Sequence, residues 1–227
     1  MPINPNAAIE ITAFKWVPPF AEGFVRDLRA RWALEEIGAE YRVRLIGGPS
    51  DRPSDYCQDQ PFNQVPVYKE GELCLFESGA ILIHIGEKDE RLLPRDTVGR
   101  MRAIAWVIAA LNSIEPQTGQ LAAIDVFNPD AAWGKERRPA VVQLVEGRLA
   151  RLSQWLGDKT WLEGDRFTVG DLMMVDALRG LGPELLNEHA NLAALVERGT
   201  SRPAFQRALA DQIATFREHQ PPEGVAA

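Results

Sequence analysis

The sequence predicts an α/β domain followed by an all-α domain, because strand patterns and helix patterns occupy different parts of the chain. Every run that reads as a strand, rich in β-branched and aromatic residues, ends before residue 77. After a linker at residues 89–96, which contains Pro94, apolar residues recur only at helical spacing. We therefore expect one domain over residues 1–88 and an all-helical domain over residues 97–227.

The composition is that of a globular protein and argues against several functions. Of the 227 residues, 45% are hydrophobic and 25% are charged. The net charge of −7 argues against a nucleic-acid partner, which requires a basic surface. Cys57 and Cys74 have neither metal-ligand nor disulfide spacing, and the three histidines are scattered, so we expect no bound metal.

The sequence gives no sign of a targeting signal or of a membrane span. The first six residues are short and polar, without the basic and apolar regions of a signal peptide. The longest apolar run, residues 103–111, is far shorter than the roughly 20 residues of a membrane span. We expect a cytoplasmic protein with no membrane partner.

The first elements follow in β-α-β order. Residues 9–14 read as a strand, and the two prolines within residues 15–20 exclude an α-helix there. Residues 22–37 have apolar positions at helical spacing and end at Gly38, a natural residue for a helix C-terminus. Residues 41–45 form the second strand, and residues 54–59 allow one helical turn.

Residues 60–88 combine a hairpin with the start of a helix. Residues 65–68 and 73–76 read as strands around a turn at residues 69–71, and a helix begins at Ser78. A cis bond before Pro66 would leave the N–H and C=O of Val65 free to pair with an extended ligand. Ser78, as an N-cap, would bind a carboxylate with the helix amides, and Glu77 could hold an amine. Together they suit the end of an α-amino acid.

The remaining segments are helical. Residues 97–121 form one helix with a possible kink near Pro116, and residues 136–156 form the next. Shorter helices are expected at residues 192–198 and 203–216. Thr168-Val169-Gly170-Asp171 reads as a capping box at the start of a further helix, and it stabilises that helix without taking part in chemistry.

The order of these motifs resembles the cytosolic glutathione transferase superfamily over nearly the whole chain. Asn-Gln-Val-Pro, a hairpin and Glu-Ser-Gly-Ala-Ile resemble its glutathione-binding core, and the capping box resembles one in its sixth helix. The resemblance implies a thioredoxin-like first domain, glutathione as co-substrate and a homodimer. It also implies that Val65, before the cis Pro66, pairs with the cysteinyl backbone, that Glu77 and Ser78 hold the γ-glutamyl end, and that Gln64 lies near the glycyl end.

The catalytic position departs from the family pattern. A Tyr, Ser or Cys usually follows the first strand and stabilises the glutathione thiolate, but neither residues 15–17 nor residues 23–26 contain a hydroxyl or thiol. Trp16 and Arg26 are the candidates found there. Three interpretations remain open: helix amides aided by Arg26 or Lys15 stabilise the thiolate, proximity alone promotes the reaction, or the protein has no transferase activity.

The resemblance also implies an acceptor pocket that faces the first helix of the second domain. The candidates that lie on neighbouring turns, with Trp16 added from the first domain, are Trp16, Met101, Ala105, Trp106 and Ile108. They suggest a small, apolar electrophile, to be conjugated or reduced with glutathione. A specialised isomerase or dehalogenase is also compatible, as is a non-enzymatic interaction or regulatory protein that retains the fold.

Overall fold

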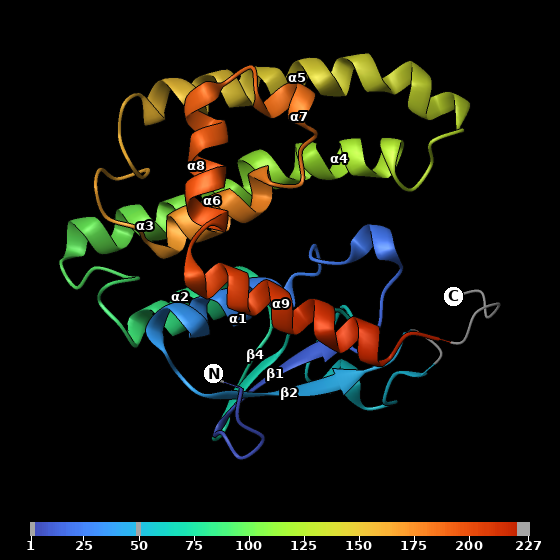
Figure 1. Cartoon of the computed structure of the whole chain (residues 1–227), viewed down its shortest axis with the longest axis vertical. Helices are drawn as coiled ribbons and strands as arrows, with labels where there is room; N and C mark the ends of the chain where they lie inside the picture. Colours follow the sequence, from blue (N-terminus) through green and yellow to red (C-terminus); the bar gives the residue numbers. More distant parts are fainter. Residues whose placement is uncertain (1–2, 49–50, 222–227) are drawn as a thin grey trace. The chain divides into compact units, whose positions relative to one another are not determined.

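The computed structural model describes residues 3–48 and 51–221, and the chain divides into two compact units (Figure 1). The first unit contains the chain up to Asp89 together with the segment from Arg202 onward. The second unit runs from Glu90 to Ser201. This division differs from the predicted domains at two places. The last helix belongs with the N-terminal unit and not with the helical one, and residues 90–96, which we expected in a linker, belong to the helical unit.

A mixed sheet forms the centre of the first unit. Its strands, in the spatial order β2-β1-β3-β4, are β1 (Ile9–Phe14), β2 (Tyr41–Ile46), β3 (Tyr68–Glu70) and β4 (Leu73–Leu75). β1 and β2 are parallel, with Ile9 opposite Tyr41, and α1 (Asp27–Ile37) connects them. β3 is antiparallel to both β1 and β4. This βαβ unit followed by a hairpin and α2 (Ser78–Glu87) is the thioredoxin-like order that the sequence predicts.

Two elements of the first unit begin later than predicted. α1 begins at Asp27 and not at residue 22, because a 3-10 helix (Pro19–Ala21) and a turn through Gly23, whose φ is +78°, precede it. β3 begins at Tyr68 and not at residue 65. Pro66 has no N–H for the ladder, although the Val67 carbonyl still accepts a 2.8 Å bond from Thr12 N–H.

The helix α9 (Pro203–Glu218) packs against α1, which is why it belongs to the first unit. The rings of Trp32 and Phe205 meet edge to face with their centroids 4.8 Å apart. The Arg207 guanidinium lies 2.6 Å from the buried Glu35 carboxylate. α9 therefore supplies an apolar and an ionic contact to the helix that leads into the candidate site.

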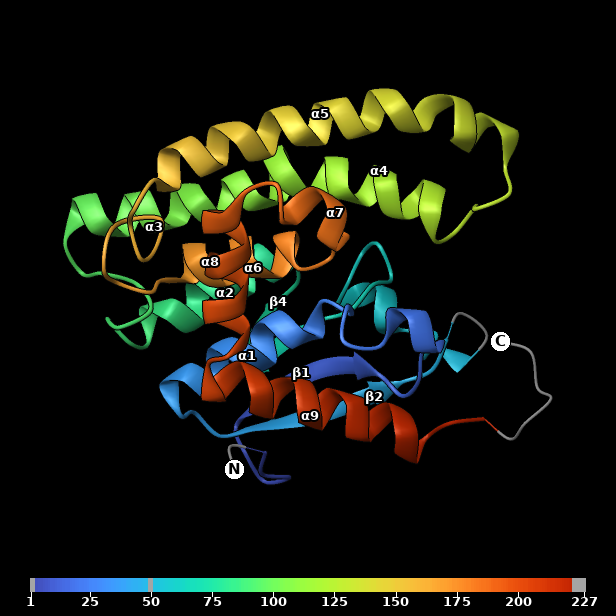
Figure 2. The same cartoon turned by 45° about the horizontal axis from the view of Figure 1, so that its top comes forward.

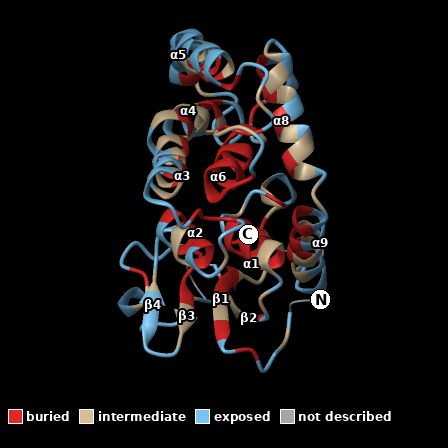
Figure 3. Cartoon of the chain, turned by 90° about the vertical axis from the view of Figure 1, so that its left-hand side faces the viewer, coloured by how far each residue is buried: buried red, intermediate tan, exposed pale blue. Residues whose placement is uncertain are grey.

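The second unit is a helical bundle in which α6 is buried on all sides (Figure 3). Its helices are α3 (Thr97–Ala109), α4 (Glu115–Asp125), α5 (Ala132–Leu156), α6 (Val169–Leu178), α7 (Pro183–Leu186) and α8 (Ala190–Thr200). A π-helical turn at Ala110–Ile114 joins α3 to α4 just before Pro116, where the sequence predicts a kink. α4 and α5 run side by side in both views (Figures 1 and 2). No helix in the described part of the chain has the length and apolar character to cross a membrane.

The capping box confirms the sequence prediction and fixes the start of α6. Asp171 Oδ2 accepts a 2.9 Å bond from Thr168 N–H, and Thr168 Oγ1 accepts one of 3.2 Å from Gly170 N–H. The other carboxylate oxygen accepts a 2.7 Å bond from Leu162 N–H. The linker at residues 89–96 also contacts the start of α6. Leu92 is buried, and its carbonyl accepts a bond from Val169 N–H.

Candidate functional site

A small polar pocket in the first unit gathers most of the predicted site residues. It lies where the turn before α1, the segment ahead of β3 and the start of α2 converge. Its lining residues are Arg26, Gln60, Gln64, Val65, Pro66, Glu77 and Ser78. All five residues that the resemblance assigns to glutathione are present, together with the candidate Arg26. Trp16 is half-buried after β1 and does not line this pocket.

The segment ahead of β3 is held by hydrogen bonds from its own neighbourhood. Tyr56 Oη donates a 2.6 Å bond to the Gln64 carbonyl. Gln60, which sequence reasoning missed, is buried, and its Oε1 accepts a 2.6 Å bond from Phe62 N–H. These bonds hold the segment in place up to Gln64 and do not involve Val65, the residue that follows.

The Val65 backbone is the part of this segment that is open to a ligand. The Val65–Pro66 peptide bond is cis. Within the described residues, neither the N–H nor the C=O of Val65 takes part in a hydrogen bond. Backbone polar groups at a buried position require partners, and an extended peptide can supply both a donor and an acceptor here.

The start of α2 presents amide donors to the same pocket. Glu77, and not Ser78 as predicted, is the N-cap, with φ +70° and ψ +113°. Ser78 is the first residue of the helix, and no side chain caps the helix N-terminus. The first amides of a helix have no intrahelical acceptor, so they are available to an anion. The positive φ of Glu77 is costly for a residue with a side chain, a feature that occurs mainly at functional sites.

A buried arginine lies behind Ser78. Arg29 in α1 is only 3% exposed, and its Nη1 donates a 3.1 Å bond to Ser78 Oγ. Since this bond occupies a lone pair of the hydroxyl oxygen, it leaves the hydroxyl hydrogen free to point toward a ligand. A guanidinium is always charged, so its field also favours an anion at this position. Arg29 thus joins the start of α2 as an anion-binding group.

The sequence contains a signal for Arg29, although Arg29 is not among the predicted site residues. Positions three and four residues after it hold Trp32 and Ala33, which are fully buried and lie on the same face of the helix. A cation on the buried stripe of an amphipathic helix requires a partner inside the protein.

The turn that carries Arg26 is anchored from α9. Gln212 Nε2 donates to the Val25 carbonyl at 3.1 Å and to Asp27 Oδ1 at 2.7 Å. Asp27 also lies 2.7 Å from the Arg31 guanidinium, and burial raises the pKa of its carboxyl. Lys15, the other cation considered for the thiolate, is paired with Asp51 at 3.2 Å. Arg26 is therefore the cation of the two that lies in the pocket.

Chemically, the pocket can bind an extended zwitterionic peptide, but it offers no side-chain hydroxyl or thiol at the expected catalytic position. Among the described lining residues, Ser78 alone has a hydroxyl, and it lies at the anion end. The predicted acceptor residues in α3 lie on two faces. Met101, Ala105 and Ile108 are exposed, whereas Trp106 faces α5 and α6 in a separate pocket.

Comparison with known proteins supports the class that this fold defines, a thioredoxin-like domain joined to a helical bundle. Residues 20–87 match "Glutathione S-transferase, N-terminal domain", and residues 120–203 match "Glutathione S-transferase, C-terminal domain". Glutathione S-transferase GstA of Escherichia coli O157:H7 is 30% identical over 195 residues, which are 81% of this chain and 92% of that protein. The chain belongs to the cytosolic glutathione S-transferase superfamily.

Two further similarities bear on chemistry. The disulfide-bond oxidoreductase YfcG of Escherichia coli (strain K12) is 30% identical over 151 residues, covering 61% of this chain and 68% of that protein. A glutathione transferase from Burkholderia graminis, solved with two glutathione molecules bound per subunit, superposes with a TM-score of 0.77. It is 25% identical, and the match covers 95% of this chain and 89% of that chain.

Proposed function

We propose that this protein uses glutathione as a thiol nucleophile or reductant on a small, apolar electrophile. The observation that carries the proposal is the open backbone of Val65 next to the anion-binding start of α2. A backbone edge and an anion site side by side suit a short peptide that ends in an α-amino acid. Glutathione has this structure, and the family to which the chain belongs uses it.

Each part of the pocket corresponds to one part of the tripeptide. Val65 N–H and C=O pair with the cysteinyl backbone, and Gln64 lies toward the glycyl end. The γ-glutamyl carboxylate is held by Ser78 Oγ and the first amides of α2, with Arg29 behind them. Glu77 takes the ammonium group. Arg29 is thus a positioning residue that acts through Ser78.

The thiolate has to be stabilised by groups other than a hydroxyl or thiol. A free thiol has a pKa of about 8.5, and cations or helix N-termini lower that value. Arg26 lines the pocket, and the amides at the start of α1 are the backbone donors nearest to it in sequence. These amides, with Arg26, are the proposed stabilising groups, and the turn anchored by Gln212 sets their position.

Assembly, location and the acceptor site complete the proposal. The rings of Phe62 and Phe76 are 67% and 38% exposed and meet with their centroids 6.4 Å apart. This exposed aromatic pair is the proposed contact of a homodimer, because it would be buried on association. A cytoplasmic location and an acceptor site that includes Trp16, Met101, Ala105, Trp106 and Ile108 remain predictions.

The experiment is titration calorimetry of glutathione into the wild type and Ser78→Ala. Ser78→Ala should weaken binding by about 1–3 kcal/mol, because a desolvated carboxylate loses a donor. Ser201→Ala, at an exposed position away from the pocket, is the matched control and should bind as the wild type does. If Ser78→Ala binds glutathione as tightly as the wild type does, the assignment of this pocket to glutathione is wrong.

The second candidate is a non-enzymatic interaction or regulatory protein. It is favoured by the missing hydroxyl or thiol at the catalytic position and weakened by the pocket that gathers the residues proposed to bind glutathione. If the wild type fails to bind at millimolar glutathione, this alternative replaces the first. Binding without turnover across a panel of electrophiles and disulfides would restrict the protein to a glutathione-binding role.

A further inference from the structure

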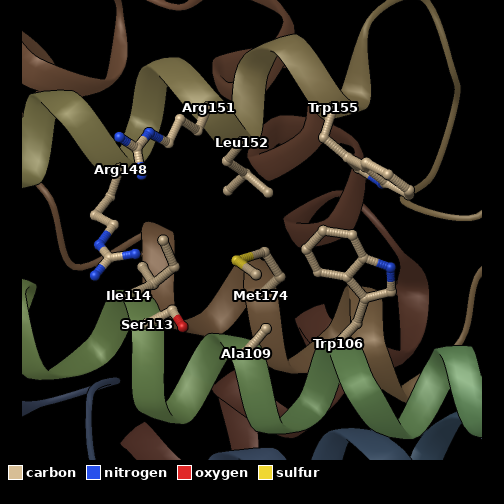
Figure 4. A pocket seen from close by; sticks show the side chains of 9 residues that line it. All are labelled: Trp106, Ala109, Ser113, Ile114, Arg148, Arg151, Leu152, Trp155 and Met174. Atoms are coloured by element: carbon tan, nitrogen blue, oxygen red, sulfur yellow. The ribbon is translucent and has the colours of Figure 1, made fainter.

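A second pocket lies wholly within the helical unit and is lined by α3, the π-helical turn after it, α5 and α6 (Figure 4). It has a volume of about 240 Å³. Its lining residues are Trp106, Ala109, Ser113, Ile114, Arg148, Arg151, Leu152, Trp155 and Met174. Among them, Ile114, Leu152 and Met174 are buried and form an apolar base. No residue of the proposed glutathione site takes part.

Two indole rings form one side of this pocket, and their orientation is fixed by the protein. Trp106 Nε1 donates a 2.6 Å bond to Glu163 Oε1, and Trp155 Nε1 donates a 3.1 Å bond to the Leu162 carbonyl. The ring centroids are 5.5 Å apart at an interplanar angle of 51°. Because both N–H groups are already satisfied, the rings offer a ligand apolar surface that is held in place before it binds. The Trp155 ring also carries the Lys159 ammonium, 4.4 Å from its centroid, so Trp106 offers the more open ring.

Two arginines from α5 form the other side. In Figure 4 both guanidinium groups lie on the side of the pocket away from the indoles, that of Arg148 beside Ile114 and that of Arg151 alongside α5. Neither arginine has an ion pair or hydrogen bond within the described part of the chain, and none of the lining residues described is acidic. By contrast Arg102, which lies over the Trp155 ring, is paired with Glu163. The pocket is thus positively charged in a protein whose net charge is −7.

We propose that this pocket binds a small aromatic carboxylate. A flat ring of one or two fused cycles would lie against the indoles and Met174, since aromatic rings and thioethers both make favourable contacts with a ring. The carboxylate would be held by Arg148 and Arg151, whose planar donor groups match its geometry. A neutral ring would leave both guanidinium groups without a partner, and a simple anion would leave the apolar base exposed. The ligand therefore has to combine both features.

The test compares 1-naphthoate with the neutral 1-naphthamide by titration calorimetry on the full chain. The wild type should bind 1-naphthoate at least about tenfold more tightly than the amide, because hydrogen bonds to charged groups contribute that much or more. Arg148→Gln with Arg151→Gln should remove this preference. The matched control, Lys135→Gln with Arg137→Gln, makes the same charge change at exposed positions of α5 outside the pocket and should keep it.

A second variant tests the location by filling the pocket. Ala109→Phe places a ring between the tryptophans and Met174 and should weaken both ligands by more than about tenfold while the helical circular dichroism is retained. Saturating glutathione should leave 1-naphthoate binding unchanged. The proposal is overturned if the arginine pair and its control lose affinity equally, if Ala109→Phe still binds 1-naphthoate, or if glutathione displaces it.

Discussion

The two pockets of this protein differ in the groups that they offer to an anionic ligand. In the first unit the donors are the backbone of α2, the hydroxyl of Ser78 and an arginine that is almost completely buried behind it. In the helical unit the charge comes from Arg148 and Arg151, which reach the pocket from the surface of α5, and recognition of the ligand depends mainly on apolar rings. The first pocket suits a polar peptide, and the second suits an aromatic acid.

The charged groups of the two sites differ in their access to solvent, so the two sites should differ in how strongly salt affects binding. Charges that reach water are screened by salt within about 10 Å at 0.1 M ionic strength, whereas buried charges are screened much less. Binding at the helical pocket should therefore weaken as salt is added, and binding at the proposed glutathione pocket should change less. The variants below therefore separate residues that affect the free energy of unfolding from residues that affect ligand affinity.

The largest expected effect comes from removing the carboxylate that closes the start of α6. Asp171→Ala leaves the buried N–H groups of Leu162 and Thr168 without acceptors, so the free energy of unfolding should fall by about 3 kcal/mol. Urea unfolding followed by tryptophan fluorescence measures this loss. Glutathione affinity of the folded variant should be unchanged, since no residue of that pocket is touched. A loss below about 0.5 kcal/mol would show that water replaces the carboxylate.

The same carboxyl predicts a pH dependence of stability. Burial raises the pKa of Asp171 to about 6, against bonds from Leu162 and Thr168 that favour the carboxylate. The folded state then holds a proton that the unfolded state releases near its ordinary pKa of 3.8. The contribution of this proton to the free energy of unfolding is complete below pH 3.8. It is lost as the pH rises through 6, by up to about 3 kcal/mol.

Asp171→Asn removes this titration, so the difference in unfolding free energy between the wild type and Asp171→Asn is the quantity to follow from pH 4 to pH 7. The stability of the wild type should fall relative to the variant over that range. A difference that stays flat would mean that the bonds from Leu162 and Thr168 balance burial, and one that changes in favour of the wild type would mean that they outweigh it; either result contradicts the prediction.

A smaller effect is expected where α6 meets α3. A Cβ added at Gly170 would lie 2.6 Å from Trp106 Cβ and 2.9 Å from the Ala103 carbonyl oxygen. Gly170→Ala should therefore push Trp106 out of place and cost about 2 kcal/mol of unfolding free energy. Binding of 1-naphthoate should be lost with it, while glutathione binding persists. Gly147→Ala, at a position with nothing within 4 Å of the added Cβ, is the control.

Much of the first unit could be predicted because its signals are local in sequence. Val65-Pro66 and Glu77-Ser78 are dipeptides whose backbone demands are visible without a structure, and the structure brings both to one pocket. The capping box at Thr168 is local in the same way. The start of α1 was predicted too early because helical spacing alone does not show that Gly23 adopts a positive φ.

The features that were missed depend on distant contacts. Arg29 gains its role from Ser78, 49 positions away, and Gln212 gains its role from Asp27, 185 positions away. The helical pocket takes its lining from α3, the π-helical turn after it, α5 and α6, so no single stretch predicts it. Trp106 was grouped with exposed neighbours because spacing does not distinguish two adjacent faces of a helix.

The smallest effect, and the sharpest test of the contrast, concerns Arg29. Arg29→Gln keeps a donor for Ser78 Oγ but removes the buried charge, so glutathione affinity should fall by about 1.5 kcal/mol. Arg29→Lys keeps the charge and should recover part of the loss. Because a structural role would also lower stability, the unfolding free energy has to be measured alongside affinity.

The dependence on the ligand's charge separates the two roles of Arg29. Glutathione and an analogue with the γ-glutamyl carboxylate converted to an amide should differ in affinity for the wild type and bind Arg29→Gln almost equally. If Arg29→Gln weakens both ligands by the same factor, Arg29 only supports the fold around Ser78. In that case the helix amides alone supply the charge at this pocket, and the glutathione site would lack the buried cation that distinguishes it from the pocket beside Arg148 and Arg151.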